Sequence, residues 1–283
     1  MSIHPLAVVS PEAKLGVGVK VGAFAIVEPD VELGDFCSVA SGAVIKSGVA
    51  AGCHNEFGEH SVIGGAPQHA ARPQTIGRLV IGDHNVFREY VTVHRALKVG
   101  MNTTIGDMNF VMASAHVGHD VAIGNNVIFA NASLLGGHVV VEDRAFVSGA
   151  VAVHQFCRIG RLAMVGGHAR VVQDVPPYML IDGISGCVVG LNIVGLKRSG
   201  HTSADIADLK AAYRIIYRRG LAWSEVLSTL RVEFPEGPVA HVHEFLSKGS
   251  RGFVQERRGP PTSTLRLRVP DEDAAPVIRS KAG

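Results

Sequence analysis

Histidine is concentrated in one part of this 283-residue chain, between residues 94 and 168. Six of the fourteen histidines lie there: His94, His116, His119, His138, His154 and His168. Asp120 directly follows His119, so an imidazole and a carboxylate are neighbours in the sequence. Imidazole gains and loses a proton near neutral pH, and a carboxylate can orient it. The pair therefore indicates general-base catalysis, in which His119 takes a proton from a hydroxyl.

The spacing of these residues decides whether they can act together. If each turn of the chain is three six-residue units long, His119, His138 and Gln155 fall on three successive turns, because each gap is within one residue of a full turn. Adjacent strand residues point to opposite faces, so a direct contact between His119 and Asp120 requires a corner. Gly137 lies one turn from His119, and its backbone N–H is a candidate for stabilising an oxyanion.

Two other uses of the clustered histidines remain open from spacing alone. Neutral imidazole is a common zinc ligand. The γ-type carbonic anhydrases, which wind in similar turns, hold zinc with histidines about two turns apart. Two regular turns before His119 and His116 lie Asp83 and Val80, so this match is poor. The remaining possibility is a purely structural ladder of polar side chains along one edge.

A six-residue repeat supplies turns of the required length. Of the 29 positions at residues 3, 9, 15 and so on to 171, 26 are Ile, Val, Leu or Phe, and only Ala51, His69 and Thr75 differ. A period of six matches neither a helix at 3.6 residues nor a simple strand at 2, so it indicates a repeat architecture. Three such hexads make one triangular turn of a parallel β-helix, and each turn buries its interior only against its neighbours.

Two further positions of the hexad are restricted. The fifth position is predicted to point inward and to be small or slender, as at Ala7, Ala13, Val19, Ala25, Val31, Cys37 and Ala43. Glycine follows the opening residue in 14 of the 29 hexads. We attribute these glycines to the unusual φ angles that tight corners can demand.

The repeat is interrupted twice. Residues 64–79 lack the opening aliphatic residues and are predicted to form a loop that leaves the β-helix. Loops of this length in compact domains are usually functional, and Gln68, His69 and Arg72 are candidates for covering a site. An exposed loop without function is the alternative. A second, shorter irregularity is expected around residues 97–103.

The end of the repeat predicts the domain organisation. We assign residues 1–178 to the β-helix and 179–256 to a linker followed by a small α-helical domain, and we expect residues 257–283 to be disordered. Thr202 or Ser203 is predicted to cap the longest helix, which ends before Gly220. Further helical segments are expected at residues 192–198, 222–234 and 238–247.

Composition excludes several classes of partner. A net charge of +2 with 18% charged residues gives no basic surface of the kind that binds nucleic acid. No run of 18 apolar residues is present, so no transmembrane segment is predicted. The first residues lack the basic start and apolar core of a signal peptide, and a cytoplasmic location is expected.

Several segments resemble one family. They are AHVGHD (115–120), GGHVVVED (136–143), VHQFCRIG (153–160), MVGGHARVVQDVPPY (164–178) and NIVGLKRSG (192–200). They are similar to the bacterial UDP-N-acetylglucosamine 3-O-acyltransferases that begin lipid A synthesis, and the resemblance covers about residues 1–255. It implies a left-handed β-helix, although parallel crossovers are usually right-handed. It also implies a homotrimer with sites between subunits, and an acyl carrier protein as donor.

The resemblance also assigns roles to residues. His119 corresponds to the general base, Asp120 to its supporting carboxylate and Gly137 to the oxyanion-binding amide. Positions that line the sugar and donor groove in the family correspond to His116, His138, His154 and Gln155, with Gln68 and His69 on the loop. Positions that bind the nucleotide correspond to Asn192 and Arg198. Gly167 corresponds to the position that measures acyl length, and a small residue there is compatible with a longer chain.

The chain departs from the family pattern at four positions. The loop usually carries Gln-Asp-x-Lys, whereas His69 and Ala71 replace the Asp and the Lys here. Val194 replaces an acidic residue, and Ser199 replaces a second arginine after GLK. A lost charge-assisted contact typically costs about 1.5–3 kcal/mol, so these changes are expected to alter recognition of the sugar and the nucleotide.

The sequence and the resemblance together predict an enzyme without metal or cofactor. We expect it to transfer a 3-hydroxy fatty acyl group from acyl carrier protein to the 3-hydroxyl of a UDP-N-acetylhexosamine. One alternative is N-acylation of an amino-modified UDP sugar, whose amine needs less help from a base. A zinc enzyme like the carbonic anhydrases and a binding scaffold without catalytic activity also remain open.

Overall fold

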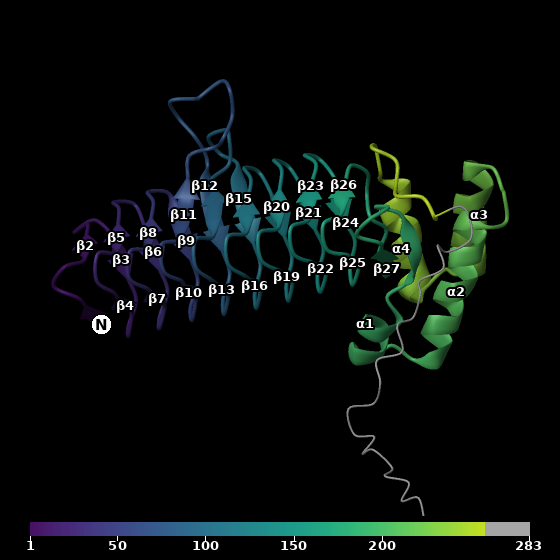
Figure 1. Ribbon diagram of the computed structural model, residues 1–283, viewed down its shortest axis with the longest axis horizontal. Helices are drawn as coiled ribbons and strands as arrows, with labels where there is room; N and C mark the ends of the chain where they lie inside the picture. Colours follow the sequence, from purple (N-terminus) through teal and green to yellow (C-terminus); the bar gives the residue numbers. More distant parts are fainter. Residues whose placement is uncertain (258–283) are drawn as a thin grey trace, which may run out of the picture.

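The chain forms a long three-sided β-helix that is closed at one end by a group of α-helices (Figure 1). The computed structural model describes residues 1–257. Apart from the last strand of the first sheet, the paired strands run parallel, and the coils wind in the left-handed sense. The predicted mainly-β, left-handed parallel β-helix with C-terminal helices is therefore confirmed. The predicted disorder of the C-terminal tail concerns residues that, from 258 on, lie outside the described part.

Three sheets form the sides of the β-helix. The first sheet contains β1 (Ser2–Ile3), β4 (Lys20–Val21), β7 (Ser38–Val39), β10 (Glu56–Phe57), β13 (Val86–Phe87), β16 (Phe110–Val111), β19 (Ile128–Phe129), β22 (Phe146–Val147), β25 (Met164–Val165), β27 (Met179–Ile181) and β28 (Val188–Leu191). The second contains β2 (Val8–Val9), β5 (Ile26–Val27), β8 (Val44–Ile45), β11 (Val62–Gly65), β14 (Thr92–His94), β17 (His116–Val117), β20 (Leu134–Leu135), β23 (Ala152–Val153) and β26 (Arg170–Val171). The third contains β3 (Lys14–Leu15), β6 (Glu32–Leu33), β9 (Val49–Ala51), β12 (Arg78–Ile81), β15 (Asn102–Ile105), β18 (Ala122–Ile123), β21 (Val140–Val141) and β24 (Arg158–Ile159).

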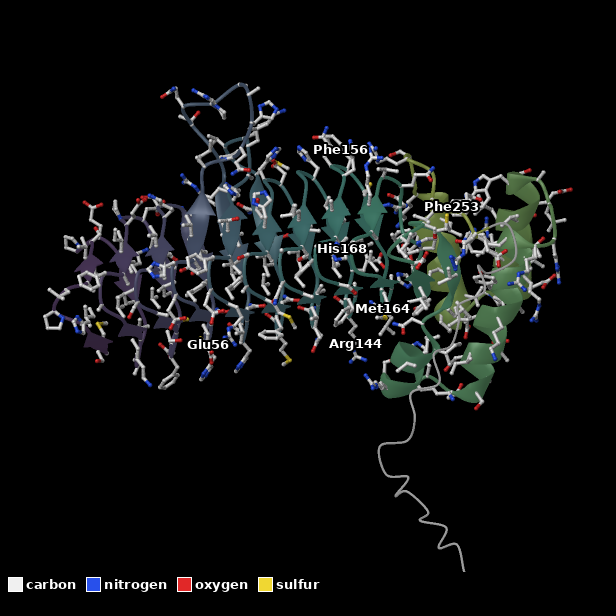
Figure 2. The ribbon with its side chains drawn as sticks, viewed as in Figure 1. Glu56, Arg144, Phe156, Met164, His168 and Phe253 are labelled. Carbon is white, nitrogen blue, oxygen red and sulfur yellow. The ribbon has the colours of Figure 1, made fainter. Side chains whose placement is uncertain are left out.

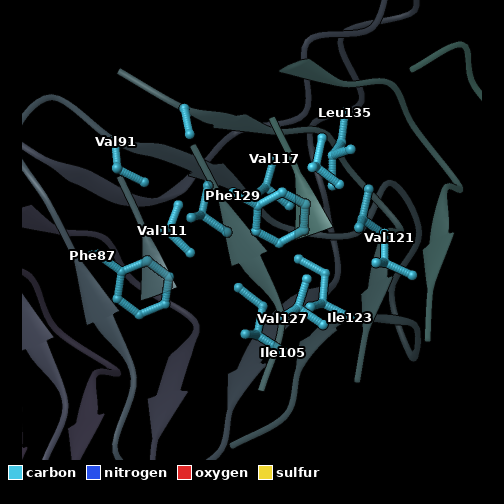
Figure 3. Packing of buried hydrophobic residues seen from close by; sticks show 14 of the residues in the cluster. Phe87, Val91, Ile105, Val111, Val117, Val121, Ile123, Val127, Phe129 and Leu135 are labelled. Atoms are coloured by element: carbon cyan, nitrogen blue, oxygen red, sulfur yellow. The ribbon is translucent and has the colours of Figure 1, made fainter. Parts of the chain in front are cut away.

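The interior of the β-helix is a column of apolar side chains (Figure 3). The residues that open the hexads point inward, and Phe57, Phe87 and Phe129 are among the largest fully buried ones. Small residues at the fifth position, such as Ala25 and Cys37, are completely buried as predicted. Removing such surface from water is the main stabilising term in the fold, at about 25 cal/mol per Å².

The glycines of the repeat have a different role from the one predicted. Positive φ angles occur mainly at the fourth position of the hexad, where non-glycine residues such as Asp120 and His138 have φ of 58° and 60°. Of the glycines after the opening residue, Gly64 and Gly100 do have positive φ as predicted, whereas most of the others are required because the next coil is too close for a side chain. A Cβ on Gly118 would lie 2.8 Å from the carbonyl oxygen of Leu135, and a Cβ on Gly136 would lie 2.7 Å from a backbone nitrogen.

The two interruptions lengthen the coils without disturbing the hexad frame. Ile63 pairs with Val93, which lies five hexads later, and Val93 pairs with Val117, which lies four hexads later. Val117 then pairs with Leu135 at the regular spacing of three hexads. The predicted loops are confirmed, and they lengthen their coils by two hexads and by one hexad. Counting two regular turns back from His119 to Asp83 is therefore wrong, because that count ignores both insertions.

A ladder of asparagines crosses the apolar interior. Asn55, Asn85 and Asn109 occupy fifth positions of successive coils and are fully or almost fully buried. Asn85 Nδ2 donates to Asn55 Oδ1 at 3.0 Å, and Asn109 Nδ2 donates to Asn85 Oδ1 at 2.9 Å. Because each amide satisfies its neighbours, the polar groups are buried without a large penalty.

Replacing Asn85 with alanine should destabilise the β-helix. The change leaves donors of Asn109 without their buried acceptor, and each unsatisfied buried group costs about 1–3 kcal/mol. We expect the free energy of unfolding, measured by denaturant titration, to fall by roughly 2–4 kcal/mol. Asn131, which is exposed, provides the control. If Asn85→Ala and Asn131→Ala have the same effect, the ladder does not stabilise the fold.

The segment after the last regular coil is more ordered than predicted. The linker predicted at the start of residues 179–256 follows Pro176 and Pro177, which end the repeat. Instead β27 continues the first sheet in parallel with β25, and β28 pairs with β27 in the antiparallel sense. The prolines lie before β27, where the missing N–H groups interrupt no strand.

Four helices follow the strands: α1 (Ile193–Arg198), α2 (Ser203–Tyr217), α3 (Trp223–Glu233) and α4 (Gly237–Ser247). Each lies within two residues of its predicted position. Thr202 caps α2 as predicted, with its hydroxyl accepting from Asp205 N and its own N–H donating to Asp205. Ile206 and Leu209 then face a second buried cluster shared by the helices. None of the helices in residues 1–257 is long and apolar enough to cross a membrane.

A buried ion pair connects the helices to the last coils. Arg158 Nε donates to Asp174 Oδ2 at 2.8 Å, and Arg158 Nη2 also donates to the carbonyl of Phe245 in α4 at 2.8 Å. Asp174 is only 2% exposed. The contact fixes the helical end relative to the coils that carry the candidate site.

Candidate active site

The candidate site lies along one edge of the β-helix, where the second sheet meets the third. We call this the histidine edge and define it by the corners at residues 118–120, 136–138 and 154–156. The three-hexad spacing between β17, β20 and β23 places His119, Gly137 and Gln155 above one another. The predicted vertical row therefore exists. His138 belongs to the neighbouring row, one position later in each corner.

His119 and Asp120 form a direct pair. His119 Nδ1 lies 2.7 Å from Asp120 Oδ2, and both side chains are about nine-tenths buried. The contact is possible because Asp120 adopts the left-handed conformation, which turns its side chain back toward its neighbour. The predicted need for a corner is confirmed. With Nδ1–H donating to the carboxylate, the Nε2 lone pair of His119 is free to accept a proton.

Asp120 is held by the second loop, which the sequence did not reveal as part of the site. Leu97 N donates to Asp120 Oδ2 at 3.0 Å, and Asp120 N donates to the hydroxyl of Thr103 at 2.8 Å. Thr103 is fully buried at a fifth hexad position. The sequence did contain one signal of this role: Thr103 places a hydroxyl at a hexad position that normally holds an apolar group.

Gly137 lies directly against the ring of His119. A Cβ on Gly137 would come within 2.8 Å of His119 Nε2, so any other residue would displace the imidazole. The N–H groups of Gly136 and His138 donate to carbonyls of adjacent coils. Within residues 1–257, the Gly137 N–H has no such acceptor. It therefore remains available close to the nitrogen that would carry the reaction.

His138 forms the next layer of the edge. Its ring is perpendicular to that of His119 at 5.2 Å and stacks on Phe156 at 4.7 Å. The sequence pointed to Gln155 as the residue above His138, whereas Phe156 occupies that place. Gln155 and His154 are exposed at the same corner, and His154 Nδ1 lies 3.0 Å from the carbonyl of Gln155.

His116 and His94 lie on adjacent strands beside the edge. Their ring centroids are 5.0 Å apart, and His116 Nδ1 lies 2.9 Å from the hydroxyl of Thr92. Burial, followed by the effect of His94, lowers the pKa of His116 to about 4. Burial also lowers the pKa of His94 from its ordinary value. Both rings are therefore neutral at physiological pH and serve as hydrogen-bonding groups.

Because the pKa of His116 is lower in the folded than in the unfolded chain, the stability of the fold depends on pH. The unfolded His116 has an ordinary pKa of 6.5, so between pH 6.5 and about 4 the unfolded chain binds a proton that the folded chain does not. The stability associated with neutral His116 is complete above pH 6.5 and is lost as the pH falls toward 4. We expect His116→Gln to reduce the loss of unfolding free energy between pH 7 and 5, measured by urea titration. An unchanged pH dependence would contradict this assignment.

The long loop reaches the site, as the sequence suggested. It spans residues 66–77 and projects from the β-helix between β11 and β12 (Figure 1). The ring of His69 lies edge-on to that of His119, with centroids 5.7 Å apart. Gln68 and Arg72 are exposed on the same loop. His69 is thus the loop residue that reaches His119.

Asn192 and Arg198 lie at a second edge, where the third sheet meets the first. They border a groove of about 750 Å³ together with Arg144, and Val194 and Ser199 line the same groove. Two of the four departures from the family pattern therefore fall in one place. The side chain of Asn192 caps α1 and donates to the carbonyl of Leu162, so it also has a structural role. Arg144 is a groove residue that the sequence did not suggest.

One chain does not bring all the predicted residues together. The histidine edge carries Phe156, whereas Arg144 and Met164 lie on the opposite side of the molecule in Figure 2. Gly167 belongs to the third edge, between β25 and β26, and a Cβ there would meet nothing closer than 3.5 Å. The groove of Arg198 and the open position of Gly167 are therefore separate from His119 within a single chain.

The fold and this edge define a class of protein. A β-helix of hexad coils with a His–Asp pair beside a free backbone amide is the arrangement expected of a hexapeptide-repeat transferase. Residues 102–137 match the family described as bacterial transferase hexapeptide (six repeats). Residues 174–254 match the family described as UDP N-acetylglucosamine O-acyltransferase, domain 2.

Individual relatives narrow the class to one family. The chain is 42% identical over 260 residues to the acyl-[acyl-carrier-protein]–UDP-N-acetylglucosamine O-acyltransferase of Burkholderia orbicola, covering 89% of this chain and 99% of the relative. It is 45% identical over 255 residues to the enzyme of the same name from Alkalilimnicola ehrlichii, with the same coverage. The solved UDP-N-acetylglucosamine acyltransferase of Francisella novicida superposes with a TM-score of 0.87 at 31% identity, over 90% of this chain and 95% of that one. The chain belongs to the UDP-N-acetylglucosamine O-acyltransferase family.

Proposed function

We propose that this protein transfers a fatty acyl group from acyl carrier protein to the 3-hydroxyl of UDP-N-acetylglucosamine, an early step of lipid A synthesis in the cytoplasm. The pairing of His119 Nδ1 with Asp120, which leaves Nε2 on the side of the ring that lies against Gly137, is the observation that supports this reaction best. The names of the relatives specify both substrates. The reaction as proposed requires no metal or cofactor.

The chemistry follows from three groups. His119 Nε2 removes the proton of the sugar hydroxyl while its oxygen attacks the thioester carbonyl. The Gly137 N–H stabilises the oxyanion of the tetrahedral intermediate. When the intermediate collapses, the carbon–sulfur bond breaks and the imidazolium of His119 returns the proton to the leaving thiolate. Asp120 orients the ring and stabilises its positive charge during the reaction.

The acceptor is the first property to test. Purified full-length protein is incubated with 3-hydroxyacyl-acyl carrier protein and either UDP-N-acetylglucosamine or its 3-amino analogue. We expect transfer to the hydroxyl acceptor. Transfer to the amine alone would favour N-acylation, and turnover of neither would contradict both activities. Acyl donors of different chain lengths would then be compared with the wild-type protein and the Gly167→Met variant. The comparison tests whether the open position of Gly167 accepts the end of a longer acyl chain.

We further propose that the protein acts as a homotrimer with each site shared between two subunits. His119 and Arg198 lie at different edges of one chain, yet both match positions that act in one site of the family. A neighbouring copy that presents its groove edge to the histidine edge would bring them together. In a cyclic trimer, every subunit then supplies both halves to different sites.

Mixed trimers test this arrangement. His119→Ala and Arg198→Ala are each expected to be nearly inactive when produced alone. When the two variants are co-expressed in equal amounts, about a quarter of the sites should combine an intact His119 with an intact Arg198 from the neighbour. We expect roughly that fraction of wild-type activity per chain, with the trimer verified by light scattering. Recovery of no activity would show that both residues act within one chain.

A further inference from the structure

The histidine edge contains a group of side chains suited to binding a metal ion. One ligand atom from each of His119, Asp120 and His138 lies within 4.8 Å of the others. His138 Nε2 is 3.8 Å from Asp120 Oδ2, and His119 Nδ1 is 2.7 Å from the same oxygen. The three residues come from two adjacent coils of a rigid β-helix, so their positions are fixed before a ligand arrives.

From this geometry we propose that His119, Asp120 and His138 bind a divalent transition-metal ion such as Zn²⁺, which inhibits the enzyme. In a tetrahedral zinc site the Zn–N distance is about 2.0–2.1 Å, which places two imidazole centroids roughly 5 Å apart. The centroids of His119 and His138 are 5.2 Å apart. Two contacts must then adjust to about 3.3 Å: the 2.7 Å contact between His119 and Asp120 widens as the ion replaces the shared proton, and the 3.8 Å contact between His138 and Asp120 shortens.

The donor set selects the kind of ion. Two imidazoles and one carboxylate suit Zn²⁺, Co²⁺ or Ni²⁺. Mg²⁺ and Ca²⁺ prefer a shell made of oxygens and should not bind. Asp120 provides the one carboxylate of this donor set. Two further histidines lie nearby: His69 is edge-on to His119, and His94 lies beside His116. No Lys or Arg forms an ion pair with Asp120 within residues 1–257.

The tautomer of His119 explains why the ion would inhibit. A neutral imidazole carries one N–H. If Nδ1 coordinates the metal, the proton must be on Nε2, and Nε2 then cannot accept the proton of the acceptor hydroxyl. The ion also occupies the carboxylate that would stabilise an imidazolium. This effect on turnover rests on the proposed function, whereas binding of the ion does not.

Binding is measured first and without substrates. Untagged full-length protein is titrated with Co²⁺, and the visible absorption of the bound ion is followed before and after displacement by Zn²⁺. We expect one Co²⁺ per chain at this site and no effect of Mg²⁺. His138→Gln and Asp120→Asn should each weaken binding by at least about tenfold, with circular dichroism verifying that the variants are folded.

A matched pair of histidines elsewhere provides the control. The rings of His54 and His84 stack at 4.7 Å on adjacent coils of another edge. His54→Gln and His84→Gln should leave the Co²⁺ spectrum and affinity unchanged. Binding that persists in folded His138→Gln and Asp120→Asn, or that is lost equally in the two control variants, would overturn the proposed site.

Inhibition is then tested separately. Zn²⁺ should abolish acyl transfer at concentrations that saturate the site, and a chelator should restore it. Stoichiometric binding without inhibition would contradict the inhibitory role while leaving the site intact. If the protein transfers no acyl group even without metal, the proposed function fails, and the Co²⁺ titration still decides whether the metal site exists.

Discussion

Replacing His119 with alanine should lower the rate of acyl transfer by about 10²–10⁴-fold, the range typical of general-base catalysis. The variant removes the ring that lies against Gly137, and the buried Asp120 cannot take over, because its oxygen is engaged by Leu97 and faces His119. The loss should fall on kcat with acyl carrier protein thioester and UDP-N-acetylglucosamine, measured by product formation under saturating conditions.

His60→Ala is the matched control for this variant. His60 occupies a corner of another edge, where its φ is positive, and its ring stacks on Tyr90 two coils from the site. Alanine tolerates this conformation, since Ala132 and Ala150 adopt it at the same edge. His60→Ala should retain wild-type kcat. A His119→Ala enzyme within about tenfold of wild type would contradict the role of general base.

The fall in rate caused by His119→Ala also distinguishes a hydroxyl acceptor from an amine acceptor. A hydroxyl has to lose its proton as it attacks, whereas an amine attacks through its lone pair and needs less help from a base. If the 3-amino sugar is the preferred acceptor, His119→Ala should reduce its acylation far less than it reduces acylation of the hydroxyl. The comparison uses one variant and both acceptors in the same assay.

The sequence predicted the fold because the hexad reports burial directly. Most opening residues face a closed interior, so an apolar side chain recurs at the start of nearly every hexad. Exposed opening residues such as His69, Thr75 and Val99 lie in the two insertions. The same periodicity placed His119 above Gly137, because three hexads separate equivalent points on adjacent coils. The site therefore followed from counting wherever the coils keep their regular length.

Counting failed where the coils change length. The insertions are whole hexads, two in the first and one in the second, so the pattern continues while the coil register shifts. The contacts of Leu97 and Thr103 with Asp120 arise at the second insertion, where the regular spacing of three hexads no longer tells which residues lie on adjacent coils. Phe156, and not Gln155, lies above His138. In each corner the residue with the left-handed conformation is one position later than the row of His119, and the side chains of these residues stack on each other.

The groove posed a different difficulty. A sequence motif places Asn192 and Arg198 in the family's site, but it does not state which edge of which subunit they occupy. Their separation from His119 follows from the arrangement of the sheets, because their groove also contains Arg144, which Figure 2 shows on the opposite side of the molecule from Phe156 of the histidine edge. The mixed-trimer experiment is informative for this reason, since it tests whether the two residues act together from different chains.

Replacing Asp120 with asparagine should reduce kcat by at least about 10²-fold, and by up to about 10⁴-fold by analogy with catalytic triads. Asparagine has the same shape and adopts positive φ readily, as Asn126 does in another corner. The change therefore removes the charge and keeps the fold. When His119 accepts the substrate proton it becomes an imidazolium, and in this buried site the carboxylate at 2.7 Å is the group that compensates its charge.

The division between kcat and KM tests whether Asp120 positions and supports His119. Because Asp120 is buried beneath His119 and supports charge only during reaction, KM for both substrates should change by less than about threefold while kcat falls. Asp107→Asn is the control, because Asp107 accepts a backbone N–H from Asp83 in a similar way and Asn125 occupies the equivalent place in the next coil. Asp107→Asn should retain activity. If Asp120→Asn lowers activity only by raising KM or by lowering thermal stability, Asp120 has a structural role and His119 acts without a charged partner.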